Sequence, residues 1–194
     1  MLNKSIMSLI FLSALIFQGC SSDSSSEKQV TQVDEANSMI AKSQNEYILT
    51  STDTKQYVVK KEANGFVLEG AEGKVLIIDI FATWCPPCKA AASHLSSLQE
   101  KYKDDLVILG VTIEDDIPNE KLEDFKKQYN ANYVLVNSTV NRRLVNDVAA
   151  ALEVGDRFPI PLMALYKDGK LINHYVGAVE EEFIASDIKK AMGI

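Results

Sequence analysis

The chain has 194 residues, of which 46% are hydrophobic, enough for one domain with a substantial core. Its formal charge of −7 argues against nucleic acid as a partner and against a basic patch that binds anionic lipid. Only three cysteines occur, Cys20, Cys85 and Cys88. They are too few for a scaffold held together by several disulfides, and the histidines are too scattered to complete a structural zinc site.

Residues 1–19 are typical of a secretory signal peptide. Lys4 supplies a positive charge, and the apolar stretch 6–17 is too short to span a bilayer comfortably. Gly19 and Cys20 resemble the processing site of bacterial lipoproteins, so we expect Cys20 to be lipidated and to become the new N-terminus. An ordinary signal peptide or an uncleaved short anchor is the alternative. In each case the domain is expected to lie outside the cytoplasm.

Residues 20–45 are predicted to form a linker that begins at the lipidated cysteine. The segment is polar and rich in serine, and it has no apolar period. A flexible chain of this length has a root-mean-square reach of roughly 25–30 Å. The remaining domain, 46–194, would therefore work close to a membrane surface.

The first half of this domain predicts a hairpin followed by a β-α-β unit. β-Forming segments at 47–49 and 57–59 flank a polar turn. The continuous apolar runs 75–81 and 106–113 are typical of strands covered on both faces. Between them, apolar residues at helical spacing predict an amphipathic helix: Ala91, Leu95, Leu98 and Tyr102. A right-handed crossover would make the two strands parallel.

The second half continues with alternating helices and strands. Helical spacing begins at Asn119, a short strand covers 133–136, and a further helix covers 140–152. Residues 157–166 lead into a long strand, and Asp168-Gly169 is a hairpin signal before its antiparallel partner. A last helix contains Phe183, Ile184, Ile188 and Ala191.

The motif Cys85-Pro86-Pro87-Cys88 lies between a predicted strand and a predicted helix, which is the context of a redox-active pair. At a helix start, free N–H groups and the macrodipole favour the thiolate of Cys85, which is the nucleophile in disulfide exchange. We expect this sulfur to be reachable by solvent. Cys88, one turn further along, could then attack a mixed disulfide.

The two prolines of the motif limit how strongly the thiolate is stabilised. Neither Pro86 nor Pro87 has an N–H to donate, so the N–H of Cys88 is the nearest backbone donor. We therefore expect the pKa of Cys85 to be lowered only modestly. A less stabilised thiolate makes the dithiol a better reductant.

Asp79 interrupts the apolar run 75–81. It could be an outward-facing carboxylate at the end of the strand, or a buried carboxylate below the cysteines with a raised pKa. The large apolar residues on both sides favour the buried position. A buried Asp79 could accept the proton that Cys88 must lose before it attacks.

From Tyr47 onward, the chain resembles the thioredoxin-like superfamily, and most of all the extracytoplasmic, membrane-tethered thiol–disulfide oxidoreductases of the TlpA/ResA type. The resemblance is carried by residues 82–89, by Asp79 and by Ile160-Pro161. It implies an α/β fold of three layers: a central mixed β-sheet with helices on both faces, an N-terminal hairpin, and a strand-and-helix insertion at 114–153.

The resemblance also implies roles for individual residues. Cys85 would be the attacking cysteine and Cys88 the resolving one, with Trp84 packed beside them. Pro161 would be the cis-proline, and the backbone of Ile160 would pair with the substrate chain. Pro159 is the alternative candidate for the cis bond.

Three departures from the family pattern leave the subfamily open. Ser93 replaces a proline that usually kinks the helix, and residues 90–92 lack a common glutamate. Asp79 is more typical of thioredoxins than of the tethered reductases.

By this resemblance, the chain is expected to be a lipid-anchored reductant on the periplasmic side of a bacterial membrane. Its clients would be proteins with thiols or disulfides, with apocytochrome c as one candidate, and a membrane thiol reductant would supply electrons. A disulfide oxidase or isomerase is the alternative. The CxxC spacing disfavours copper delivery, and the motif at a helix start disfavours a purely structural disulfide. We expect a monomer without cofactor or metal; the choice between inner and outer membrane stays open.

Overall fold

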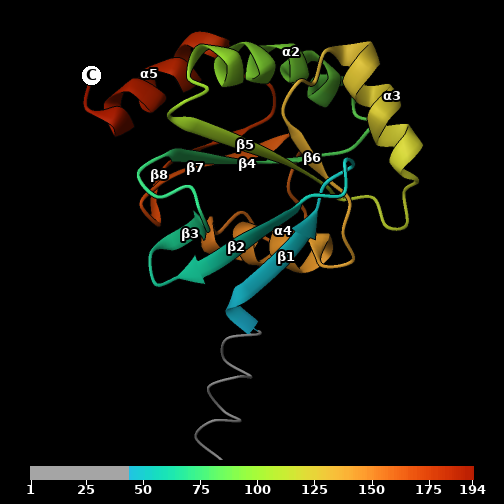
Figure 1. The fold of residues 1–194 in the computed structure, drawn as a ribbon, viewed down its shortest axis with the longest axis horizontal. Helices are drawn as coiled ribbons and strands as arrows, with labels where there is room; N and C mark the ends of the chain where they lie inside the picture. The colour runs from blue at the N-terminus through green and yellow to red at the C-terminus, as the bar shows by residue number, and fades with distance from the viewer. Residues whose placement is uncertain (1–43) are drawn as a thin grey trace, which may run out of the picture. The chain divides into compact units, whose positions relative to one another are not determined.

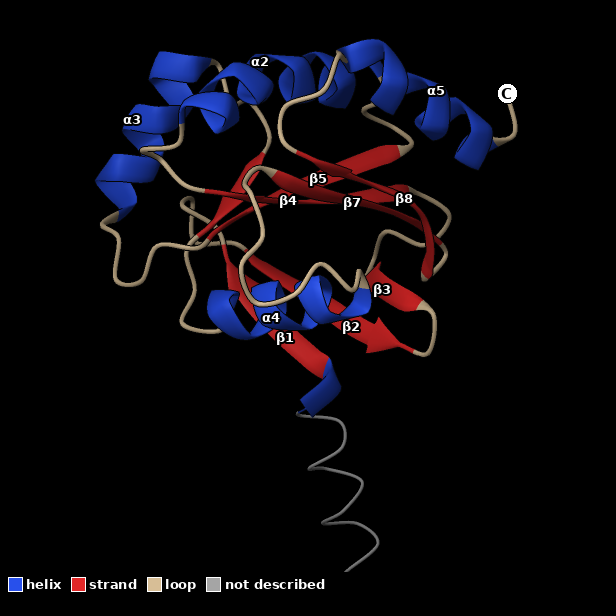
Figure 2. Cartoon of the chain, turned by 180° about the vertical axis from the view of Figure 1, so that it is seen from behind, coloured by secondary structure: helices blue, strands red, loops and turns tan. Residues whose placement is uncertain are grey.

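The computed structural model describes residues 44–194, so the predicted signal peptide, the lipidation of Cys20 and nearly all of the linker lie outside the described residues. The described residues form three layers (Figure 1). A five-stranded sheet lies in the middle, helices α2, α3 and α5 cover one face, and α4 with a three-stranded sheet covers the other (Figure 2). This architecture confirms the predicted three-layer α/β fold.

The strands are β1 (Glu46–Thr50), β2 (Gln56–Glu62), β3 (Gly65–Leu68), β4 (Val75–Phe81), β5 (Leu106–Thr112), β6 (Val134–Val136), β7 (Leu162–Lys167) and β8 (Lys170–Val176). The helices are α2 (Pro86–Lys101), α3 (Asn119–Tyr129), α4 (Asn141–Ala151) and α5 (Glu181–Met192). The central sheet has the order β6-β5-β4-β7-β8. Strands β4, β5 and β6 are parallel, whereas β7 runs antiparallel to β4 and to β8. The predicted parallel β-α-β unit is therefore present as β4-α2-β5.

Strand β4 is buried along its whole length because it separates two hydrophobic cores. Side chains alternate along a strand, so Val75, Ile77 and Phe81 point into the core beneath α2, α3 and α5. Leu76, Ile78 and Ile80 point into the core beneath α4 and the three-stranded sheet. This double burial explains why the run reads as continuously apolar.

The N-terminal region is larger than the predicted hairpin. Strand β3 pairs with β2, so β1, β2 and β3 form a three-stranded antiparallel sheet. A bridge between Ser51 and Val136 joins the end of this sheet to β6. The N-terminal sheet thereby shares the second face of the central sheet with α4.

Residues 157–161 lead into strand β7, as predicted, and the strand itself begins at Leu162. Pro159 and Pro161 lie in this segment, and a proline cannot donate to a ladder of strand hydrogen bonds. The segment before Leu162 is consequently a loop, and it reaches the start of α2. Of the helices in residues 44–194, none has both the length and the apolar character needed to cross a bilayer.

Candidate active site

The cysteine motif sits where β4 ends and α2 begins. Cys85 is the N-cap residue of α2, and Pro86 and Pro87 occupy the first two helical positions. The N–H of Cys88 donates to Sγ of Cys85 at 3.2 Å, and the two cysteines form a disulfide with their Cα atoms 5.3 Å apart. The predicted N-cap geometry, with Cys88 as the backbone donor, is confirmed.

The exposure of the motif differs from our expectation. We expected the sulfur of Cys85 to be reachable by solvent, but the residue is only 2% exposed and Cys88 is 3% exposed. Their neighbours form the outer surface instead: Trp84 is 61% exposed, and Pro86 and Pro87 are exposed as well. The disulfide is covered because the start of α2 packs into the core below the helices.

The loop before β7 contacts the disulfide directly. The peptide bond between Ile160 and Pro161 is cis, and Sγ of Cys85 lies 3.6 Å from the carbonyl oxygen of Ile160. The N–H of Gly177 donates to the carbonyl oxygen of Pro161 at 2.8 Å, which ties this loop to the end of β8. Residues 75 positions apart in the sequence therefore meet at one sulfur atom.

A hollow of about 250 Å³ adjoins this contact. Trp84 and Ile160 form one part of its wall and link it to the disulfide, while Phe158, Arg157 and the N-terminal part of α4 complete it. The wall combines apolar side chains with the charged side chains of Arg142, Asp156 and Arg157.

Asp79 lies inside the core on the α2 side. It is 2% exposed, and strand alternation puts its side chain on the face that carries Ile77, Phe81 and the helix with Cys88. Burial raises the pKa of Asp79 to about 7, and a hydrogen bond from Tyr133 partly opposes this rise. The buried position with a raised pKa is the one expected from the sequence.

Tyr133 is a residue of the site that sequence reasoning missed. Its hydroxyl donates to Oδ2 of Asp79 at 3.1 Å, while Oδ1 of Asp79 has no hydrogen-bond partner. Tyr133 precedes β6, two strands away from β4. An aromatic residue at a strand start gives no signal in the sequence that it contacts a carboxylate.

Glu114 is a second residue of the site that sequence reasoning missed. Its carboxylate accepts the N–H of Thr83 at 2.6 Å and the hydroxyl of Thr83 at 2.9 Å. It also accepts the hydroxyl of Thr112 at 3.2 Å. Glu114 thereby fixes the turn between β4 and Cys85, and it does so from the end of the neighbouring strand β5.

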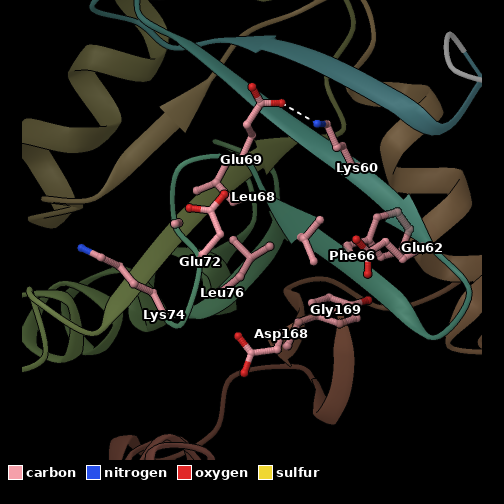
Figure 3. A pocket seen from close by; sticks show the side chains of 13 residues that line it. Lys60, Glu62, Phe66, Leu68, Glu69, Glu72, Lys74, Leu76, Asp168 and Gly169 are labelled. Atoms are coloured by element: carbon pink, nitrogen blue, oxygen red, sulfur yellow. Dashed lines mark ion pairs between the residues drawn. The ribbon is translucent and has the colours of Figure 1, made fainter.

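A second cavity, of about 350 Å³, lies at the other end of β4 (Figure 3). Its floor includes Phe66, Leu68 and Leu76, and charged side chains surround it. Lys60 of β2 and Glu69, which directly follows β3, form an ion pair at 2.7 Å. Neither cysteine lines this cavity, so it is separate from the disulfide chemistry.

A model of the Redoxin family matches residues 50–192. The chain belongs to the Redoxin family. Thioredoxin-T of Drosophila melanogaster is 39% identical over 62 residues, which are 32% of this chain and 36% of that protein. The thiol-disulfide oxidoreductase ResA of Bacillus cereus is 24% identical over 120 residues, 61% of this chain and 64% of that protein. The chain thus spans less than two thirds of either relative.

Solved structures agree with the fold of this Redoxin protein. A thiol:disulfide interchange protein of the thioredoxin family from Chlorobium tepidum matches with a TM-score of 0.58 at 19% identity. The match covers 77% of this chain and 94% of that structure. Together with the family match, these similarities confirm the resemblance to thioredoxin-like proteins of the TlpA/ResA type.

Proposed function

We propose that this Redoxin protein is a membrane-tethered, extracytoplasmic thiol–disulfide oxidoreductase that acts mainly as a reductant of client proteins. The direction of electron flow is inferred from the residues at the N-terminus of α2. Among the described residues, the N–H of Cys88 is the backbone donor to Sγ of Cys85, because Pro86 and Pro87 have none to give. A thiolate with few donors is stabilised little, and its dithiol gives up electrons readily.

In the first step, the thiolate of Cys85 attacks one sulfur of a client disulfide. The client S–S bond breaks, its other sulfur leaves as a thiolate, and a mixed disulfide forms. In the second step, the thiol of Cys88 gives its proton to the carboxylate of Asp79 and attacks Sγ of Cys85. The client's second sulfur leaves, the client has gained two electrons, and Cys85 and Cys88 are left as a disulfide.

Asp79 suits this second step because its pKa, raised by burial to about 7, lies near neutral pH. A carboxylate with an ordinary pKa would hold the proton too weakly to help the thiol ionise. A thiol reductant in the membrane is proposed to return the two electrons, with the lipid on Cys20 keeping the domain within its reach.

The client is proposed to dock on the loop before β7. The backbone of Ile160, next to the disulfide, can pair with an extended client segment, and the adjoining hollow can hold one of its side chains. A segment around a disulfide of apocytochrome c is a suitable client, since it must be reduced before haem can be attached.

Trapping tests the exchange reaction. In cells that express full-length Cys88→Ala, Cys85 can still attack but the mixed disulfide cannot be resolved. We expect covalent complexes that disappear on reduction, and mass spectrometry of these complexes identifies the client. Cys85→Ala is the matched control and should trap nothing. If Cys88→Ala also traps nothing, thiol exchange at this site is contradicted.

The direction of electron flow is tested by the state of the pair in living cells. Rapid acid quenching followed by alkylation separates the dithiol from the disulfide. A reductant is expected to be mostly dithiol. A pair that is mostly disulfide would favour an oxidase or isomerase in protein folding instead.

A further inference from the structure

The two oxygens of the Asp79 carboxyl group have different environments. Oδ2 accepts the hydroxyl of Tyr133 at 3.1 Å, whereas Oδ1 is buried without a hydrogen-bond partner. Asp79 is the only acidic or basic side chain among the buried residues of the described region. A buried carboxyl oxygen without a hydrogen bond destabilises the folded state, so its presence here calls for an explanation.

The sheet makes space for Tyr133 at this point. Gly110 on β5 is the register partner of Asp79, and it lies between Asp79 and Leu135 on β6. A Cβ on Gly110 would lie 2.6 Å from Leu135 and 3.0 Å from the ring of Tyr133. Gly110 therefore leaves room for the Tyr133 ring, whose hydroxyl reaches across to Asp79.

We propose that Tyr133 is a positioning residue for the exchange reaction: it occupies Oδ2 of Asp79, so that the proton released by Cys88 is held on Oδ1. The inference rests on the proposed role of Asp79 as proton acceptor. A carbonyl-type oxygen is a better acceptor than the hydroxyl oxygen of a carboxylic acid. A proton on Oδ1 therefore preserves the Tyr133 bond, whereas a proton on Oδ2 would weaken it.

Few other titratable groups face Asp79. Its core contains the two cysteines at the start of α2 and the buried tyrosines Tyr102 and Tyr175. The half-buried Lys89 of α2 lies over the ring of Tyr129 at 5.2 Å, and Glu114 after β5 is bonded to Thr83. The elements β7, α3 and α5 bring no buried acidic or basic side chain to this face. Substitution of Tyr133 is therefore the most direct way to change the protonation of Asp79.

The hydrogen bond has a defined effect on protonation. A donor to Oδ2 stabilises the carboxylate, so it lowers the pKa of Asp79 against the effect of burial. Without the Tyr133 hydroxyl, the carboxyl group should hold its proton to higher pH. Asp79 should then be able to accept a proton from Cys88 only at higher pH than in the wild type.

The experiment follows the second half of exchange alone. Full-length reduced protein is mixed with one equivalent of an aromatic disulfide that releases a coloured thiolate, once when Cys85 attacks and again when Cys88 resolves. The rate of the second release is measured against pH. In the wild type we expect it to fall on the acidic side of about pH 7, where Asp79 becomes protonated. We call the part of the profile in which the rate falls toward low pH the acidic limb. Tyr133→Phe should shift this acidic limb to higher pH by about one unit.

Two further variants make the result specific. Tyr102→Phe also removes a buried hydroxyl from the same core, but that hydroxyl has no hydrogen-bond partner, so the limb should not move. Asp79→Asn should abolish the limb. Infrared titration of the carboxyl C=O stretch in wild type and Tyr133→Phe should show the same upward shift without turnover.

The outcomes separate the inference from its premise. If Asp79→Asn abolishes the limb and Tyr133→Phe leaves it in place, the role of Tyr133 is refuted while the proposed function stands. If Asp79→Asn leaves the limb unchanged, both the role of Asp79 and that of Tyr133 are refuted. A shift of equal size in Tyr102→Phe would likewise refute a specific role.

Fluorotyrosine at position 133 provides a test that does not remove the ring or its hydroxyl. It is a stronger donor than tyrosine, so the acidic limb should move to lower pH. A limb that stays in place or moves upward would contradict the inference.

Discussion

Asp79→Asn is a substitution whose effect on stability follows directly from the structure. Asparagine has nearly the shape of aspartate and keeps an oxygen that can accept the Tyr133 hydroxyl, but it cannot ionise. In the wild type, Asp79 is 2% exposed, and burial raises its pKa from 3.8 to about 7. The variant therefore removes the cost of ionising a carboxyl group inside the core.

The sign and size of the effect come from proton linkage. Because the pKa of Asp79 is higher in the folded than in the unfolded protein, the folded state binds more protons between about pH 4 and pH 7. The contribution of Asp79 to stability is fully present below pH 4 and is lost as the pH rises through 7. A rise in pKa of about three units corresponds to about 4 kcal/mol, which is an upper limit for the loss by pH 8.

The assay is urea unfolding of the oxidised protein at several pH values, for wild type and Asp79→Asn in parallel. The free energies of unfolding should be similar near pH 4, and the variant should be more stable by as much as about 4 kcal/mol at pH 8. Asp104→Asn, at an exposed position, controls for the loss of one surface charge. If the difference between Asp79→Asn and wild type is the same at both pH values, the reasoning about buried Asp79 is refuted.

Glu114→Ala should lower the rate of disulfide exchange several-fold and the free energy of unfolding by about 2 kcal/mol, because the N–H and hydroxyl of Thr83 lose a charged acceptor. Turnover and urea unfolding measure the two effects, and unchanged turnover would mean that the turn before Cys85 is held by other contacts. Gly110→Ala should reduce the free energy of unfolding by about 1–3 kcal/mol, since its Cβ would overlap Leu135 and press on the Tyr133 ring. Urea unfolding checks this, and a loss below about 0.5 kcal/mol would show that the core adapts freely.

Much of the fold could be predicted because local patterns carry it. The apolar run of β4, the helical spacing in α2 and the Asp168-Gly169 turn each report their own burial or backbone geometry. The third strand of the N-terminal sheet was harder to predict from the sequence. Strand β3 has only four residues, and its place beside β2 is fixed by pairing and by the core it shares with α4.

The exposure of the cysteines is a property that local sequence patterns did not predict. The sequence places Cys85 at a helix start, and that position is correct. Whether the sulfur is open or covered depends on how the start of α2 packs into the core and against Ile160, which lies 75 positions further along the chain. The prediction of an open sulfur failed for this reason.

From the sequence alone came the dithiol, its place at the start of a helix, the two prolines that withhold N–H groups, and a carboxyl group inside an apolar strand. These are properties of neighbouring residues, so short-range chemistry specifies them. Only the tertiary structure brought Tyr133 to Asp79, Glu114 to Thr83 and Ile160 to Cys85. The order and register of the strands decide these contacts, and that order is set by packing across the whole sheet.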